Sequence, residues 1–148
     1  MYKKILVPLD GSPLAEKILD SVEELAKEFR AKVIFLKVEE DPFILGYDEV
    51  IEESTSQRQI EHRKQIESYL NRTEKRFQEK GIETKYYIAH APVVPTLLTL
   101  AEKEDVDLIA LASHGLDGSF RTMCRSVAAR LLERANKPLL LIQKVSDA

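Results

Sequence analysis

Short runs of branched apolar residues alternate along the chain with longer segments in which apolar residues recur at helical spacing. The runs predict strands covered on both faces, and the longer segments predict helices with one apolar side. This alternation predicts an α/β fold with an open, five-stranded parallel sheet, right-handed crossovers and helices on both faces. The predicted strands are Lys4–Leu9, Lys32–Val38, Ile82–Ile88, Val106–Ala112 and Leu139–Ile142, with Ile82–Ile88 at an edge because it is the most polar.

Turn and capping residues set the predicted helix boundaries. Ser12 and Pro13 supply an N-cap and a first helical residue, so the first helix begins there, with Glu23 among the residues on its solvent side. The second helix runs from about Ser56 to Lys80 and is closed by Gly81, after a predicted loop over residues 39–55. The fourth helix begins near Ser126. The apolar seams of the first two helices are Leu14, Ile18, Val22, Leu25, Ala26 and Phe29, and then Ile66, Tyr69, Leu70, Thr73 and Phe77.

Length, charge and cysteine content narrow the function classes. The 148 residues fit one domain over residues 1–148, and a net charge of −3 gives no long-range attraction for nucleic acid or an anionic membrane. No apolar run approaches the ~20 residues of a membrane span. The lone Cys124 excludes an intramolecular disulfide and a cysteine cluster for zinc, and we expect a cytoplasmic protein. His62 has Ile66 at i+4 and is predicted to be a surface residue, with no metal site.

Candidate chemistry concentrates between Val106 and Ser126. An apolar run passes there into small and glycine residues and then into a helical pattern, which is how α/β proteins build an anion site from backbone N–H groups. In open parallel sheets, ligands collect at the carboxyl ends of the strands where the strand order reverses. That location would bring together Asp10, the residues after Val38 and the segment 112–126.

Five motifs follow one another along nearly the whole chain. They are Lys3-Lys4-Ile5-Leu6-Val7-Pro8-Leu9-Asp10-Gly11-Ser12, Asp105-Val106-Asp107-Leu108-Ile109, Ser113-His114-Gly115, Ser126-Val127-Ala128, and Lys137-Pro138-Leu139-Leu140-Leu141-Ile142. Taken in this order and at these spacings, they resemble the motifs of the universal stress protein family. The resemblance implies a Rossmann-like sheet of order 3-2-1-4-5 and a homodimer paired through the strand Leu139–Ile142.

One branch of the family binds ATP with a pattern of Gly, two residues, Gly, nine residues, and Gly followed by Ser or Thr. In this chain the four positions are Ala112, Gly115, Arg125 and Ser126, so two glycines are replaced. Glycine allows a close backbone approach to phosphate, whereas Arg125 either fills the phosphate space or pairs with phosphate. The resemblance implies ATP or another adenine nucleotide as ligand. The candidate cofactor-binding residues are Asp10, Val38, Ala112, His114, Gly115, Arg125, Ser126 and Val127.

Within the resemblance, Asp10 would face the ribose or adenine, the Val38 backbone would meet the adenine edge, and Gly115 and Ser126 would hold phosphates. A carboxylate that only favours the start of a helix is an equal alternative for Asp10. A histidine placed like His114 more often fixes its loop by hydrogen bonding than catalyses a reaction.

Three functions follow from these features: a dimeric stress-response module with an altered nucleotide site, a dimeric interaction protein with a vestigial pocket, or a slow nucleotide hydrolase. Hydrolysis would need a base, for which His114 and Asp117 are the loop candidates, and no catalytic residue is assigned. Cys124 is either a redox sensor or a small, partly buried residue.

Overall fold

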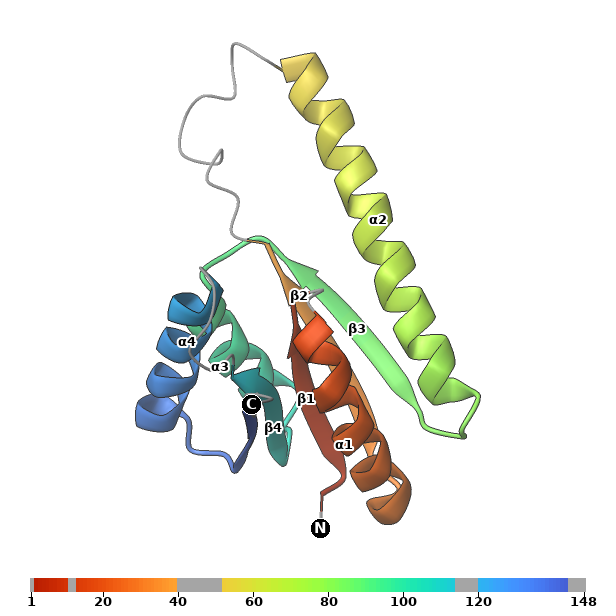
Figure 1. Ribbon diagram of the computed structural model, residues 1–148, viewed down its shortest axis with the longest axis vertical. Coiled ribbons are helices and arrows are strands. Elements are labelled where there is room, and N and C mark those ends of the chain that lie inside the picture. The colour runs from red at the N-terminus through yellow and green to blue at the C-terminus, as the bar shows by residue number, and fades with distance from the viewer. Residues whose placement is uncertain (1, 11–12, 40–51, 114–119, 144–148) are drawn as a thin grey trace, which may run out of the picture.

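The computed structural model describes residues 2–10, 13–39, 52–113 and 120–143 (Figure 1). Within them, the backbone alone is described for residues 13–16, 52–56, 113, 120–126 and 143. Strands and helices alternate throughout the described chain. In chain order the elements are β1 (Lys4–Leu9), α1 (Pro13–Phe29), β2 (Lys32–Val38), α2 (Glu52–Gln78), β3 (Thr84–Ala89), α3 (Val93–Lys103), β4 (Leu108–Ser113), α4 (Phe120–Arg134) and β5 (Leu139–Gln143).

The five strands form one parallel sheet in the order β3-β2-β1-β4-β5, which confirms the predicted topology and places β3 at an edge. The chain builds outward from β1 through β2 to β3 and then returns to the other side of β1 for β4 and β5. The strand order therefore reverses between β1 and β4, which lie side by side in the middle of the sheet.

Helices cover both faces of the sheet, α1 and α2 one face and α3 and α4 the other (Figure 1). Alternate residues of the inner strands point to opposite faces, so each strand contributes to two cores. On the α1 and α2 face the strand residues are Ile5, Val7, Leu9, Val33, Phe35, Leu108 and Ala110. On the α3 and α4 face they are Leu6, Ile34, Leu36, Ile109 and Leu111.

Two predicted helix starts are wrong. α2 begins at Glu52, so residues 52–55 of the predicted loop are helical, and α4 begins at Phe120 rather than near Ser126. Both added segments are free of Gly and Pro, so helical backbone continues through them. In α4 the apolar seam also continues, because Phe120 and Met123 lie seven and four residues before Val127. The predicted C-cap is confirmed, because Gly81 has φ of +79° and the Ile82 N–H donates to the Phe77 carbonyl at 3.1 Å.

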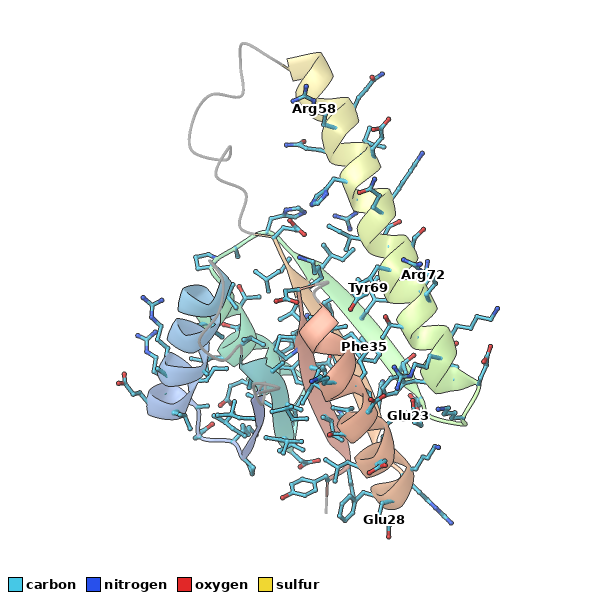
Figure 2. All side chains as sticks on the ribbon, in the orientation of Figure 1. Glu23, Glu28, Phe35, Arg58, Tyr69 and Arg72 are labelled. Carbon is cyan, nitrogen blue, oxygen red and sulfur yellow. The ribbon has the colours of Figure 1, made fainter. Side chains whose placement is uncertain are left out.

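The α1 side chains depart from prediction at three positions. Phe29 is 37% exposed and packs edge-on against Tyr2, while Leu19, absent from the predicted seam, is 1% exposed. Glu23, predicted to face solvent, is only 7% exposed. The reason is that α2 lies beside α1 and covers this flank, so that Glu23 sits between the two helices (Figure 2).

Candidate ligand site at the carboxyl ends of the strands

The pairing between β1 and β4 is short. Over the described residues of both strands it joins Ile5 with Leu108 and Leu6 with Ile109 and goes no further. By contrast, β1 pairs with β2 at six successive residues, from Lys4 to Leu9. The two central strands therefore stop pairing before their carboxyl ends, at the place where the strand order reverses.

Pro8 explains why this pairing stops. The Lys4 carbonyl accepts from the Asp107 N–H at 2.9 Å, and peptide groups alternate in direction along a strand, so Lys4, Leu6 and Pro8 all face β4. The next bond of the ladder would run from the N–H of residue 8 to the Ala110 carbonyl. Proline has no N–H, which is why it is rare inside sheets. The sequence thus interrupts the sheet at its topological switch point, where open α/β sheets bind ligands.

The backbone of Val38 is directed toward the same place. The Val33 N–H donates to the Glu83 carbonyl at 3.0 Å, and the Glu39 N–H donates to the Ala89 carbonyl at 2.7 Å. Odd-numbered residues of β2 therefore face β3, and Val38 faces β1. Because the pairing with β1 ends at Lys37 with Leu9, the Val38 carbonyl points past the end of β1.

The sheet order brings the first three predicted site residues to adjoining strand ends. Asp10 is exposed and directly follows β1, Val38 is half-buried at the end of β2, and Ala112 is half-buried near the end of β4. Ala112 packs against the core under α1 and α2, whereas Val38 packs against the core under α3 and α4. The roles of these residues in binding stay predictions.

The remaining predicted site residues belong to the loop after β4 and to α4. Arg125 and Ser126 lie in α4, and Val127 on the same helix is half-buried against the α3 and α4 core. The predicted residues His114, Gly115 and Asp117 lie outside the described residues, as does the side chain of Cys124.

The earlier start of α4 changes the geometry expected of the phosphate site. A helix offers its first four N–H groups to a ligand, because later N–H groups donate along the helix. With α4 beginning at Phe120, the N–H groups of Arg125 and Ser126 come after those four. A backbone cradle at the 125–126 peptide is therefore absent from this helical backbone.

The sequence interpretation missed a cluster of charged residues beside Val38. The Glu39 carboxylate accepts a hydrogen bond from Lys37 Nζ at 2.9 Å and contacts His62 Nε2 of α2 at 3.1 Å. Burial raises the pKa of Glu39, but the hydrogen bonds and charges of Lys37 and His62 outweigh it, so the pKa lies below its ordinary value. His62 is exposed as predicted, but the periodicity of α2 carries no signal that it contacts a residue before the helix.

The described side chains contain no group of three or more His, Cys, Asp or Glu residues arranged to hold a metal ion. In the described part of the chain, no helix has the length and apolar character needed to cross a membrane.

The sheet order, the helices on both faces and the interrupted central pairing define an open, doubly wound α/β protein with a switch point between β1 and β4. Comparison with known proteins identifies its family. A sequence model of the universal stress protein family matches residues 1–143, and the chain belongs to this family.

Relatives of similar length support this assignment. Universal stress protein YxiE of Bacillus subtilis is 27% identical, and the alignment covers 97% of this chain and 100% of the relative. Universal stress protein MJ0577 of Methanocaldococcus jannaschii is also 27% identical, with 97% and 96% covered. A solved structure of MJ0577 superposes with a TM-score of 0.82 at 26% identity, covering 99% of each chain.

Two more distant solved structures share the fold and contain nucleotides. A universal stress protein in complex with cAMP has a TM-score of 0.70 at 19% identity, with 96% of this chain and 97% of the other covered. A universal stress protein of Archaeoglobus fulgidus in complex with dAMP has a TM-score of 0.65 at 18% identity, with 95% and 98% covered.

Proposed function

We propose that this protein is a stress-response signalling module that binds an adenine nucleotide at the switch point between β1 and β4. The observation that carries the proposal is the end of the β1–β4 pairing at Pro8, because it opens the central sheet where doubly wound proteins hold ligands. The cAMP and dAMP complexes of two family members support the same ligand class.

The groups at the strand ends suit a nucleoside. The Val38 carbonyl, directed past the end of β1, offers an acceptor for the exocyclic amino group of adenine. Asp10, exposed just after β1, offers carboxylate oxygens to ribose hydroxyls. Neither contact depends on the glycine positions that this sequence has replaced.

The phosphate side of the site favours a short phosphate over a triphosphate. Ala112 and Arg125 stand where the ATP pattern has glycine, and the peptide of Arg125 lies inside α4 rather than at its start. With one guanidinium in place of a backbone cradle, charge pairing with a single phosphate remains available. We therefore propose AMP or a similar mononucleotide as the preferred ligand and no hydrolysis of ATP.

Calorimetry and thermal unfolding with AMP, ADP and ATP test this function. A ligand at 100 times its Kd stabilises the native state by about 2.7 kcal/mol, which raises the Tm of a domain this size by roughly 5–10 °C. We expect AMP to give that shift and ATP a smaller one. If none of the three shifts the Tm or releases heat, the site is vestigial and the protein is an interaction module.

Two variants of α4 test the role of Arg125. Arg125→Gly restores the family pattern, and we expect it to raise the affinity for ATP relative to AMP. The matched control is Arg130→Gly, since Arg130 is exposed on the same helix and its replacement costs the same helix propensity without changing the pattern. Equal ATP-to-AMP ratios in both variants would show that Arg125 does not select the ligand.

The proposal includes a homodimer, placed in the cytoplasm, that pairs through β5. β5 forms one edge of the sheet, and Leu139, Leu140, Leu141 and Ile142 are apolar and only half-buried. An apolar strand at a sheet edge is a site for pairing with another chain. Light scattering on the purified protein gives the molar mass that decides between monomer and dimer.

A further inference from the structure

The peptide of Val38 is held from both sides by charged residues that belong to no family pattern quoted above. Lys37 and Glu39 flank Val38, and their side chains pair with each other at 2.9 Å. The Glu39 N–H is also fixed to the Ala89 carbonyl of β3 at 2.7 Å. Glu39 therefore ties the end of β2 to β3 through its backbone and to α2 through its carboxylate.

The partner on α2 lies in a part of the helix that has no core of its own. The buried seam of α2 runs from Ile66 to Phe77, and every residue from 57 to 65 is exposed. Figure 2 shows Arg58 on the portion of α2 that projects beyond the sheet. Within this exposed stretch, His62 makes a contact with the sheet end, through its Nε2 and Glu39 at 3.1 Å.

We propose that Glu39 and His62 are positioning residues that fix the Val38 peptide for adenine and couple nucleotide binding to the N-terminal half of α2. The inference rests on the proposed function, because it assigns a regulated contact to the same site. The coupling is reciprocal: a ligand that needs the ordered Val38 peptide strengthens the contact, and loss of the contact weakens the ligand by the same factor.

The side chains are suited to this role. Glu39 has two cationic or hydrogen-bonding partners on two elements, so it remains bonded on one side when the other is lost. His62 is 57% exposed, so the contact can open without leaving a buried charge. Loss of the Glu39–His62 contact would free residues 57–65 of α2 from the end of the sheet. A partner protein that binds the surface of these residues would then respond to the change.

AMP binding by calorimetry is the first test. We expect Glu39→Ala and His62→Ala each to weaken AMP binding by roughly two- to fivefold, and the double variant to lose no more than the stronger single one, because both act through one contact. His62→Gln keeps a hydrogen-bonding side chain and should recover most of the loss. The matched control is Arg58→Gln, which removes a charge one turn away on the same exposed stretch.

Hydrogen exchange of the amides in residues 57–65 is the second test, and a merely structural role would not move it. AMP should slow this exchange in the wild type and leave it unchanged in Glu39→Ala. The Tm of each variant without ligand should stay close to that of the wild type, which separates positioning from unfolding.

Each alternative outcome has a definite meaning. Equal AMP affinity in the wild type, Glu39→Ala and His62→Ala overturns the positioning role of the Glu39–His62 contact while leaving the proposed function intact. An equal loss in Arg58→Gln would show that the weaker binding does not depend on the Glu39–His62 contact, and would also overturn the proposal. If the wild type binds no adenine nucleotide, the proposed function fails and the coupling fails with it.

Discussion

The two halves of α2 differ in how much of their surface is buried. From Ile66 to Gln78 the helix has a buried apolar side, and Phe77 packs edge-on against Phe35 of β2 with ring centroids 5.2 Å apart. From residue 57 to 65 every residue is exposed, and the charged side chains include Arg58 and Arg63. One continuous helix thus joins a segment anchored in the core to a segment that lies in solvent beside the candidate site.

Ion pairs divide between the two halves in the same way. In the half anchored in the core, Arg76 Nε donates to the Glu23 carboxylate at 2.9 Å and Arg76 Nη2 donates to Asp20 at 2.6 Å. Lys80, just after the end of α2, also pairs with Glu23. Glu23 is nearly buried, so its charge requires these partners. The solvent half contacts the sheet through the exposed His62, a contact that costs little to make or break.

This difference shows how a small domain can carry a responsive element without losing stability. The burial that stabilises α2 lies toward one end of the sheet, and the residues next to Val38 lie toward the other. Movement of residues 57–65 therefore need not disturb the core under α1 and α2. Substitutions in the two halves should separate stability from binding.

Phe77→Ala should give the largest loss of stability. Phe77 is fully buried and contacts Phe35, so its removal leaves a cavity and should lower the free energy of unfolding by about 3–5 kcal/mol. Urea unfolding followed by circular dichroism measures the change. The matched control is Ile60→Ala on the same helix: Ile60 is 52% exposed, so we expect a change within about 0.5 kcal/mol.

A loss of similar size in Ile60→Ala would contradict the comparison between the two halves. It would mean that the projecting turns of α2 are buried against another surface, as in a dimer. Repeating the unfolding at several protein concentrations would distinguish that case, because dimer stability depends on concentration.

The fold could be predicted from the sequence because its signals are local. Each strand is a short apolar run, and Gly81 and Pro13 mark helix boundaries by their backbone preferences. The apolar spacing of Phe120, Met123 and Val127 already indicates the start of α4 at Phe120. The errors at Glu52 and Glu23 have one origin. Helical periodicity reports which side of a helix is apolar, and it reports neither how far a polar helix continues nor which flank a neighbouring helix covers.

The candidate site could be predicted only in part. Its location follows from topology, since the order of the strands decides which carboxyl ends meet. The roles of Pro8 and His62 do not follow from pattern. Pro8 ends the pairing of β1 with β4 because its peptide group is directed toward β4 and has no N–H. His62 contacts Glu39, which lies 23 residues earlier in the chain. Both depend on the three-dimensional arrangement of the elements.

Glu23→Gln should lower the free energy of unfolding less than Phe77→Ala does. The amide keeps the shape of the side chain but loses the charge that accepts from Arg76 and Lys80. Both cations are partly exposed and regain water when the charge is removed, so the expected loss is about 1–3 kcal/mol at neutral pH. An unchanged urea midpoint would mean that hydration of the two cations offsets the pair completely.

The same variant gives a pH signature whose sign follows from the pKa of Glu23. Burial raises that pKa, but the hydrogen bonds from Lys80 and Arg76 and their charges outweigh it, so the folded-state pKa lies below the ordinary value of 4.5. A carboxylate with a lowered pKa stabilises the fold above its unfolded-state pKa, and this contribution is lost as the pH falls through the folded-state value. The wild type should therefore lose its advantage over Glu23→Gln as the pH falls below about 4.5.

The difference in the free energy of unfolding between the wild type and Glu23→Gln separates the contribution of Glu23 from those of the other carboxylates. Glu104 also has a lowered pKa, because Tyr87 and Lys85 hydrogen-bond to it, but it titrates alike in both proteins and cancels in the difference. Urea unfolding at intervals from pH 7 to pH 3 supplies the measurement. A difference that stays constant over that range would show that the pKa of Glu23 does not change on folding. The contrast between the two halves of α2 would then rest on apolar burial.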